Sequence, residues 1–325
     1  MIRFKILAWI GAGIFLSGCN NSIKHTESEQ VAVDKYNASG GMEQKGSDTR
    51  EDVFLVQKKL PKELKENSGI VADGGVIWAI TDEKVPYIYK LDEDGNLIQT
   101  VEITGVKMKD VEAITADAEF LYVGDIGDNS GDRKKRTIYK IRKSAIGSGK
   151  NVKIKAEEIE FKFKGFEEAE KKKHNEYDAE ALISAGDQLY IFTKRRTDDK
   201  TELVSIPKTP GDYVAKSIRV FDSKGMITGA GINSTGSEIA LIGYRSGHTN
   251  SFILLLSNFT APDFFNGNQQ RIELTKSKID WQTEGITYWN DDIIYFSCET
   301  TSDVPATIYG VKKSNLERVK DEKFK

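Results

Sequence analysis

The stretch "KDVEAITADAEFLYVGDIGDN" (residues 109–129) contains two short apolar runs separated by a polar turn. Both runs are rich in β-branched and aromatic residues and are bounded by Asp, Asn or Gly, which is typical of a β-hairpin. Glu112 interrupts this pattern, because it sets a carboxylate at the start of the first apolar run. An unpaired carboxylate is costly to bury in a strand. Glu112 therefore needs an explanation, and the rest of the chain offers one.

The pattern that begins at Glu112 recurs along the chain. A small or acidic residue is followed by Gly or Ala and then by Ile or Leu, and a turn and a second apolar run come next. The five starts are Ser68-Gly69-Ile70, Glu112-Ala113-Ile114, Glu180-Ala181-Leu182, Ala230-Gly231-Ile232 and Glu284-Gly285-Ile286. A third run, such as "PYIYKLD" or "ATIYGVK", follows in each unit, and a fourth, such as "QRIELT", follows in the first four.

Four short strands repeated five times are typical of a β-propeller. The sequence therefore predicts an all-β fold, a five-bladed β-propeller. A β-sandwich with a long meander is the alternative, but it would not produce five matched units. The stretch "DVFLVQKKL" (residues 52–60) precedes the first unit, and the last unit lacks a clear fourth run. We expect this stretch to be the outer strand of the last blade, where it closes the ring.

The first 22 residues are typical of an export signal rather than of a folded segment. Arg3 and Lys5 precede an apolar stretch of 11 residues, which is too short to span a bilayer. The stretch ends in "LSGC" (residues 16–19), which resembles the lipobox of bacterial lipoproteins. The resemblance implies cleavage before Cys19 and lipid on that residue, whereas an ordinary signal peptide with an incidental Cys is the alternative. The expected organisation is a signal peptide (1–18), a lipidated Cys with a polar, flexible tether (19–51) and the propeller (52–325).

Composition limits the expected partners. The formal net charge of −3 gives no electrostatic reason to expect nucleic acid. Cys298 is the one Cys of the predicted propeller, so no disulfide is expected within it. His174 and His248 are the only His residues after the tether, and neither lies at a repeat position, so a Ser-His-Asp triad is not supported. The lipid anchor is the expected contact with the bacterial cell envelope, and Asn20 after Cys19 favours the outer membrane.

In a propeller the first strand of each blade lines the central channel. The recurring position therefore brings five side chains together near one mouth of the channel: Ser68, Glu112, Glu180, Ala230 and Glu284. The second strand runs back to the same mouth, and the residues at its end are Asp82, Asp125, Lys194, Tyr244 and Glu299. The following loops add Arg195, Arg196 and Arg245. Asp82, Asp125, Lys194, Arg195 and Arg245 are the candidates for catalytic residues.

Three Glu residues around one axis repel each other unless they are protonated, paired or bound to a cation. Oxygen ligands from Glu, Ser and backbone carbonyls suit Ca²⁺, and the absence of His and Cys from these positions argues against zinc. We therefore predict a Ca²⁺ site formed by Ser68, Glu112, Glu180 and Glu284. The alternative is that each carboxylate accepts backbone N–H bonds from the neighbouring blade. Asp110 and Asp178, two residues earlier, are either further ligands or turn residues.

The five positions, together with "LYVGDIGDN" and "IFTKRRT", resemble those of the soluble calcium-activated nucleotidases, the five-bladed apyrases. That family implies an axial Ca²⁺ held by a Ser, two Glu, a second Ser and a third Glu, so Ala230 departs from its pattern. The long Trp-rich insertion associated with nucleotidase substrate binding is also missing. The motifs "ENSGI", "DVEAI" and "QTEGI" are equally similar to the SdiA-regulated and phytase-like extracellular propellers of bacteria, for much of which no reaction is implied.

Two functions follow as alternatives. In the first, the propeller binds Ca²⁺ near its channel and acts as a binding module for a small anionic ligand or an envelope protein. In the second, it is a Ca²⁺-dependent phosphohydrolase, in which Lys194, Arg195 and Arg245 neutralise phosphoryl charge. The departures from the nucleotidase pattern favour the binding module.

Overall fold

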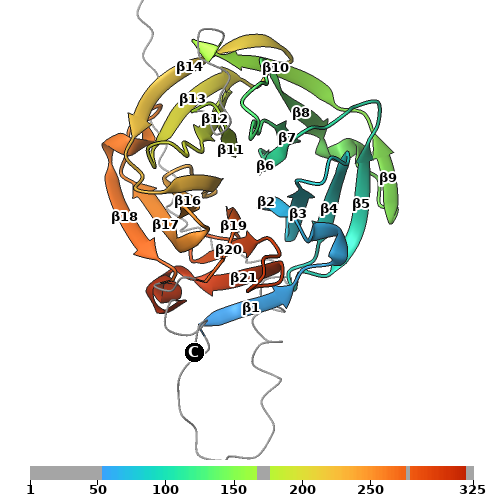
Figure 1. Ribbon diagram of the computed structural model, residues 1–325. Coiled ribbons are helices and arrows are strands. Elements are labelled where there is room, and N and C mark those ends of the chain that lie inside the picture. Colours follow the sequence, from blue (N-terminus) through green and yellow to red (C-terminus); the bar gives the residue numbers. More distant parts are fainter. Residues whose placement is uncertain (1–52, 167–175, 276–278, 320–325) are drawn as a thin grey trace, which may run out of the picture. The chain divides into compact units, whose positions relative to one another are not determined.

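A computed structural model describes residues 53–166, 176–275 and 279–319 of the chain. The predicted signal peptide, Cys19 and the tether lie outside the described residues, as does His174. The described part consists almost entirely of β-strands with a few short 3₁₀ turns (Figure 1). No helix within these ranges is long and apolar enough to cross a membrane.

The strands form antiparallel ladders of four, each running outward from a short inner strand. The first ladder contains β2 (Asn67–Asp73), β3 (Val76–Thr81), β4 (Tyr87–Leu91) and β5 (Leu97–Ile103). The second contains β6 (Val111–Ala116), β7 (Phe120–Asp125), β8 (Arg136–Arg142) and β10 (Glu157–Phe163). The third contains β11 (Ala179–Ala185), β12 (Gln188–Thr193), β13 (Thr201–Pro207) and β14 (Gly211–Phe221).

Two further ladders complete the set in the described ranges. The fourth contains β15 (Met226–Ile232), β16 (Glu238–Arg245), β17 (Thr249–Ser257) and β18 (Asn268–Glu273). The fifth contains β19 (Thr283–Tyr288), β20 (Ile293–Cys298), β21 (Thr307–Lys312) and, as its outer strand, β1 (Phe54–Lys59). The prediction that the N-terminal strand completes the last unit is confirmed. Residues 313–318, where a fourth run was unclear, form a 3₁₀ turn instead.

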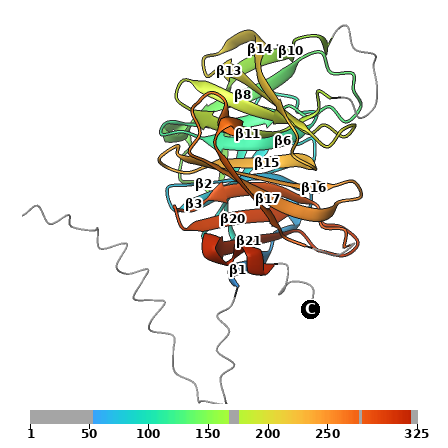
Figure 2. The ribbon, with the colours of Figure 1, turned by 90° about the vertical axis from the view of Figure 1, so that its left-hand side faces the viewer.

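The ladders stand around a common axis as in a β-propeller. The inner strands β2, β6, β11, β15 and β19 contact one another in this order and close a ring around a central channel (Figure 1). In side view they run across the thickness of the domain, from one face to the other (Figure 2). The all-β propeller fold that the repeat predicts is therefore confirmed.

Apolar side chains fill the space between neighbouring ladders. Residues alternate between the two sides of each strand, so every ladder contributes to two separate clusters. Ile88 and Val101 of the first ladder pack with Val123 of the second, for example, whereas Ile77 of the first packs with Ile308 of the fifth. One such cluster lies between each pair of neighbours, including the pair that closes the ring.

Two parallel pairings join neighbouring ladders, and the sequence pattern did not predict them. The short strand β9 (Asn151–Ile154), from the connection between β8 and β10, pairs with β5 of the first ladder. The first half of β14 pairs with β10, so the second and third ladders form one eight-stranded sheet.

Candidate cation site at the channel mouth

A local irregularity at the start of each inner strand sets up the site. The pairing with the second strand shifts between Asn67 and Gly69, and at the matching place in the other four ladders. A bulge of this kind leaves one residue unpaired and re-aims its side chain. The residues in the irregularities are Ser68, Glu112, Glu180, Thr228 and, together with Gly285, Glu284. Four of the five are the residues that the repeat predicts.

The prediction for the fourth ladder is corrected, because Thr228 rather than Ala230 occupies the bulge. The Thr228 hydroxyl donates a hydrogen bond of 2.6 Å to the carbonyl of Thr283 on the next inner strand. The Ser68 hydroxyl makes the same kind of bond, 2.7 Å long, to the carbonyl of Val111. Ala230 lies two residues farther along, in the channel wall. In "TGAGI" the full pattern fits Ala230-Gly231-Ile232, but the bulge falls two residues earlier, where Thr228-Gly229 is followed by Ala instead of Ile or Leu.

The channel itself is narrow, with a free volume of about 10 Å³. Cationic side chains neutralise the carboxylates on one side of its mouth. The Lys194 ammonium lies 2.7 Å from the Glu180 carboxylate and 5.3 Å from the centre of the Tyr244 ring. Arg196 lies 3.3 Å from Asp178 and 3.6 Å from Glu180. Burial alone would lower the pKa of Lys194, but the nearby charge of Glu180 holds it well above its usual value. Lys194 is therefore a buried ammonium ion.

The Tyr244 hydroxyl extends this neutralised side by donating a hydrogen bond of 2.9 Å to Glu284. One carboxylate oxygen of Glu180 and one of Glu284 remain buried without a hydrogen bond among the described residues. Nearby, burial and the charge of Glu284 raise the pKa of Glu299 to about 9. This side of the mouth therefore compensates its negative charge with internal cations and with retained protons.

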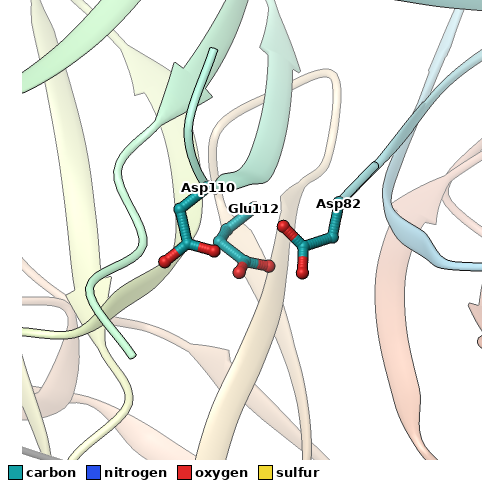
Figure 3. Close-up of side chains that lie close together, drawn as sticks. All are labelled: Asp82, Asp110 and Glu112. Carbon is teal, nitrogen blue, oxygen red and sulfur yellow. The ribbon is translucent and has the colours of Figure 1, made fainter. Parts of the chain in front are cut away.

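On the other side of the mouth, the described residues place three carboxylates together without an ion-pair partner. Oxygens of Asp82, Asp110 and Glu112 lie within 4.8 Å of one another, and the three carboxylates face each other (Figure 3). None of them forms an ion pair with a described Lys or Arg. Burial and the charge of Asp110 raise the pKa of Asp82 to about 8, and burial followed by the charge of Glu180 raises that of Glu112 well above its usual value. All three carboxylates can therefore be deprotonated together only if another positive charge lies among them.

A hard divalent cation fits this group of oxygens. Carboxylate oxygens are the ligands that Ca²⁺ prefers, and the described residues of the site offer neither His nor Cys. Of the four ligands predicted from the sequence, the group contains only Glu112. Ser68 donates to Val111, Glu180 is paired with Lys194, and Glu284 accepts from Tyr244.

The structure separates the five candidate catalytic residues. Asp82 and Lys194 lie at the mouth, but on its two different sides. The Asp125 carboxylate accepts the backbone N–H of Asp110 at 2.9 Å and lies 2.9 Å from Arg133, so it holds the start of β6 in place. Arg195 binds Asp198 through two nitrogens, at 3.0 and 2.8 Å. Arg245 is exposed and donates to the carbonyl of Lys224.

A cavity of about 850 Å³ adjoins the unpaired carboxylates. Asp82 and Asp110 form part of its wall, and the cationic residues of the wall are Lys84, Lys109, Arg133, Lys134 and Lys135. Lys135 is engaged outside the cavity by Asp212, at 2.6 Å. The lysines at this cavity were not among the predicted site residues, because they lie in loops without a repeated position.

The loop that forms one wall of this cavity is held by an ion pair that the sequence pattern did not predict. Arg136 and Asp128 are both fully buried, and their charged groups lie 2.7 Å apart. Asp128 also accepts the backbone N–H groups of Asp132 and Arg133. An Arg at the start of the apolar run "RTIYKIR" is the same kind of signal as Glu112 and could have identified this pair.

Comparison with known proteins identifies no family. No family model and no curated protein matches the chain. Among solved structures, the Dos1 propeller is 9% identical, with 71% of this chain and 52% of that chain covered and a TM-score of 0.37. Streptogramin B lyase is 11% identical, with 81% and 99% covered and a TM-score of 0.38. Regucalcin, a calcium-binding protein of Agrobacterium tumefaciens, is 12% identical, with 80% and 95% covered and a TM-score of 0.40. The chain spans about half the length of the Dos1 chain, and its assignment as a β-propeller rests on its own strand pairings.

Proposed function

We propose that the domain is a five-bladed propeller that binds one Ca²⁺ through Asp82, Asp110 and Glu112. The observation that carries this proposal is the contrast between the two sides of the mouth. Lys194 and Arg196 form ion pairs with Glu180 and Asp178, whereas the three carboxylates within 4.8 Å of one another form no ion pair with a described Lys or Arg. Ca²⁺ takes six to eight oxygen ligands, so three carboxylates leave positions for water or for an oxygen of a ligand.

The bound cation would complete a site for a small anionic ligand. Lys84, Lys109 and Lys134 line the adjoining cavity together with Asp82 and Asp110. An anion placed there can contact both the cation and the lysines, and it would bind only when the cation is present. We therefore favour a Ca²⁺-dependent binding module.

A Ca²⁺-dependent phosphohydrolase is the second candidate. The same proximity of a cation site to lysines supports it, because a metal ion and ammonium groups can both stabilise charge on a transferred phosphoryl group. Arg195 and Arg245 would not contribute, since both lie against other residues.

The proposal also includes the location of the protein. The lipobox-like segment supports attachment to the bacterial cell envelope through lipid on Cys19, with the outer membrane as the destination. Growth with labelled palmitate should label the wild-type protein and leave a Cys19→Ser variant unlabelled. Labelling of the variant would contradict the anchor.

Thermal melting with and without Ca²⁺ tests the cation site. A ligand that binds only the folded chain adds about 2.7 kcal/mol of stability at a hundredfold excess over its Kd. The full-length protein should melt at a higher temperature in Ca²⁺ than in chelator, and Asp110→Asn and Glu112→Gln should abolish the difference. Asp187→Asn, at an exposed carboxylate far along the chain, is the matched control and should keep it. If no rise occurs and metal analysis of the untreated protein finds no cation, the site does not exist.

Hydrolysis assays separate the two candidate functions. Nucleoside diphosphates and phytate should be incubated with the protein in Ca²⁺ and in chelator. A stabilising effect of Ca²⁺ without turnover supports the binding module. Turnover that requires Ca²⁺ and is lost in Asp110→Asn supports the hydrolase.

A further inference from the structure

A second cavity lies at the opposite mouth of the channel, and the proposed cation site makes no use of it. Its volume is about 550 Å³. All five inner strands contribute their far ends, which include Val71, Thr115, Ser184, Ile232 and Thr287. Since these strands start at the acidic mouth, the second cavity opens on the other face of the domain. A pocket of this size, whose wall mixes polar and apolar groups, can hold a small molecule.

The charged side chains of this second cavity are already paired. Asp117 lies 3.0 Å from Lys208, and Asp73 lies 2.7 Å from Lys143. Asp117, Asp73 and Lys208 are the charged residues of the wall in the described ranges. The cavity therefore provides no uncompensated charge for an ion, in contrast to the acidic mouth.

Hydroxyl groups supply the remaining hydrogen-bonding capacity. Ser184 is 8% exposed, and its hydroxyl is buried without a partner among the described residues. Thr115, which is 4% exposed, lines the same cavity with its hydroxyl-bearing side chain. Buried polar groups are normally paired, and leaving one unpaired costs about 1–3 kcal/mol. The two hydroxyls are therefore suited to a ligand that both donates and accepts hydrogen bonds.

Aromatic and aliphatic side chains, among them Trp289 and Ile232, also contribute to the wall. Trp289 is half-buried at the rim, and the Tyr295 ring packs against it at a centroid distance of 5.4 Å. An indole ring held in this way offers an apolar surface to a ligand. The ligand should therefore be neutral and should combine hydroxyl groups with an apolar face.

We propose that this second cavity, here called the far-end cavity, binds a neutral carbohydrate of one or two sugar rings. A pyranose ring has hydroxyls around its edge and C–H groups on its faces, which match Thr115 and Ser184 on one side and Trp289 on the other. The far-end cavity lies across a channel of about 10 Å³ from the cation site, so the two sites take different ligands. This inference does not depend on the proposed function.

Isothermal titration of the full-length protein with maltose, cellobiose and N,N′-diacetylchitobiose tests the inference. A detergent without a sugar headgroup must keep the protein in solution. At least one of the three should bind. Thr115→Val, which has nearly the same shape, and Ser184→Ala should each weaken binding by roughly 3- to 10-fold, as expected for one hydrogen bond. Trp289→Ala should weaken it by more, provided that thermal melting shows the variant to be folded.

Asp110→Asn is the matched control, because it alters the acidic mouth and should leave sugar affinity unchanged. Inorganic phosphate should not bind at the far-end cavity, since its cations are paired. The proposal is overturned if none of the three sugars binds at tens of millimolar. It is also overturned if a sugar binds but Thr115→Val, Ser184→Ala and Trp289→Ala all leave its affinity intact.

Discussion

A single residue position determines how charge is distributed at the acidic mouth. The position that follows the second strand holds Asp82 in the first ladder, Lys194 in the third and Glu299 in the fifth. The backbone N–H of each donates to a residue just before the inner strand, which confirms that the three are equivalent. An ammonium in the third ladder neutralises Glu180, whereas an additional carboxylate in the first ladder increases the negative charge near Glu112. The asymmetry of the mouth thus follows from the identity of side chains on an otherwise repeated backbone.

Replacing Lys194 should reveal the energy of the buried pair. Lys194→Met leaves the Glu180 carboxylate buried with only the more distant Arg196, and removal of one partner of a buried pair typically costs about 3–5 kcal/mol. Urea denaturation should show this loss. Adding Glu180→Gln should restore much of it, because no buried charge then remains unpaired. Simple addition of the two single effects would contradict a direct pair.

Glu299 should make stability depend on pH. Its pKa in the folded chain is raised to about 9, mainly by burial, against 4.5 for an unperturbed Glu. The folded protein therefore retains a proton that the unfolded chain has lost, and the free energy of unfolding falls as pH rises between these values, by at most about 1.4 kcal/mol per pH unit. Urea denaturation across this range, in chelator, should show a shallower slope for Glu299→Gln than for wild type. Equal slopes would mean that Glu299 ionises normally in the folded chain.

At the scale of the strand, the inner strands were predictable because their pattern is local. Gly or Ala followed by an apolar residue marks the position where neighbouring inner strands approach closely. In "TGAGI" the pattern favours Ala230 over Thr228, and the sequence could not reveal the true register, because the bond from Thr228 to Thr283 joins two different ladders. The parallel pairing of β9 with β5 was unpredictable for the same reason, since it joins segments that belong to different repeats.

Two glycines at one repeat position should respond differently to replacement by alanine. A Cβ on Gly229 would lie 2.1 Å from the carbonyl oxygen of Glu284, which belongs to the backbone of the next inner strand. A Cβ on Gly69 would meet the Ile80 side chain at 3.3 Å, and a side chain can adjust. Gly229→Ala should therefore cost several kcal/mol, of the order seen for overpacked cores, and Gly69→Ala much less. Thermal melting of both variants makes the comparison, and equal losses would contradict it.

The sequence predicted the type of candidate site, a group of carboxylates near the axis, but not which residues form it. Three Glu residues at one repeat position indicated excess negative charge near the axis, and the structure places them there. The sequence does not show which carboxylates lack a partner, because this depends on the contacts made after folding. Lys194 contacts Glu180 of its own ladder rather than Glu112 of the second. Asp110 was ambiguous because an Asp before a strand is as often a turn residue as a ligand.

For the molecule as a whole, closure of the ring depends on β1. This strand pairs with β21 from Phe54 to Lys59, and the Phe54 ring packs 5.3 Å from that of Tyr309. A chain that lacks only residues 54–59 should lose about 2 kcal/mol or more from the half-buried Phe54 and Val56, and its melting temperature should fall by roughly 5 °C. A deletion of residues 20–51, the predicted tether, is the control and should leave melting unchanged. If the two deletions melt alike, β1 does not stabilise the ring.

The position of β1 also has a consequence for the time course of folding. Synthesis proceeds from the N-terminus, so β1 is made before every other strand of the domain, while β21 is made last. Until residues 307–312 have emerged, β1 has no partner for its backbone groups, although the first four ladders are already complete in sequence. Ring closure is therefore a late event that joins the two ends of the domain, and contacts between such distant segments form slowly. The nascent chain passes through a stage with an unpaired edge strand, which is the stage most open to aggregation and to capture by chaperones.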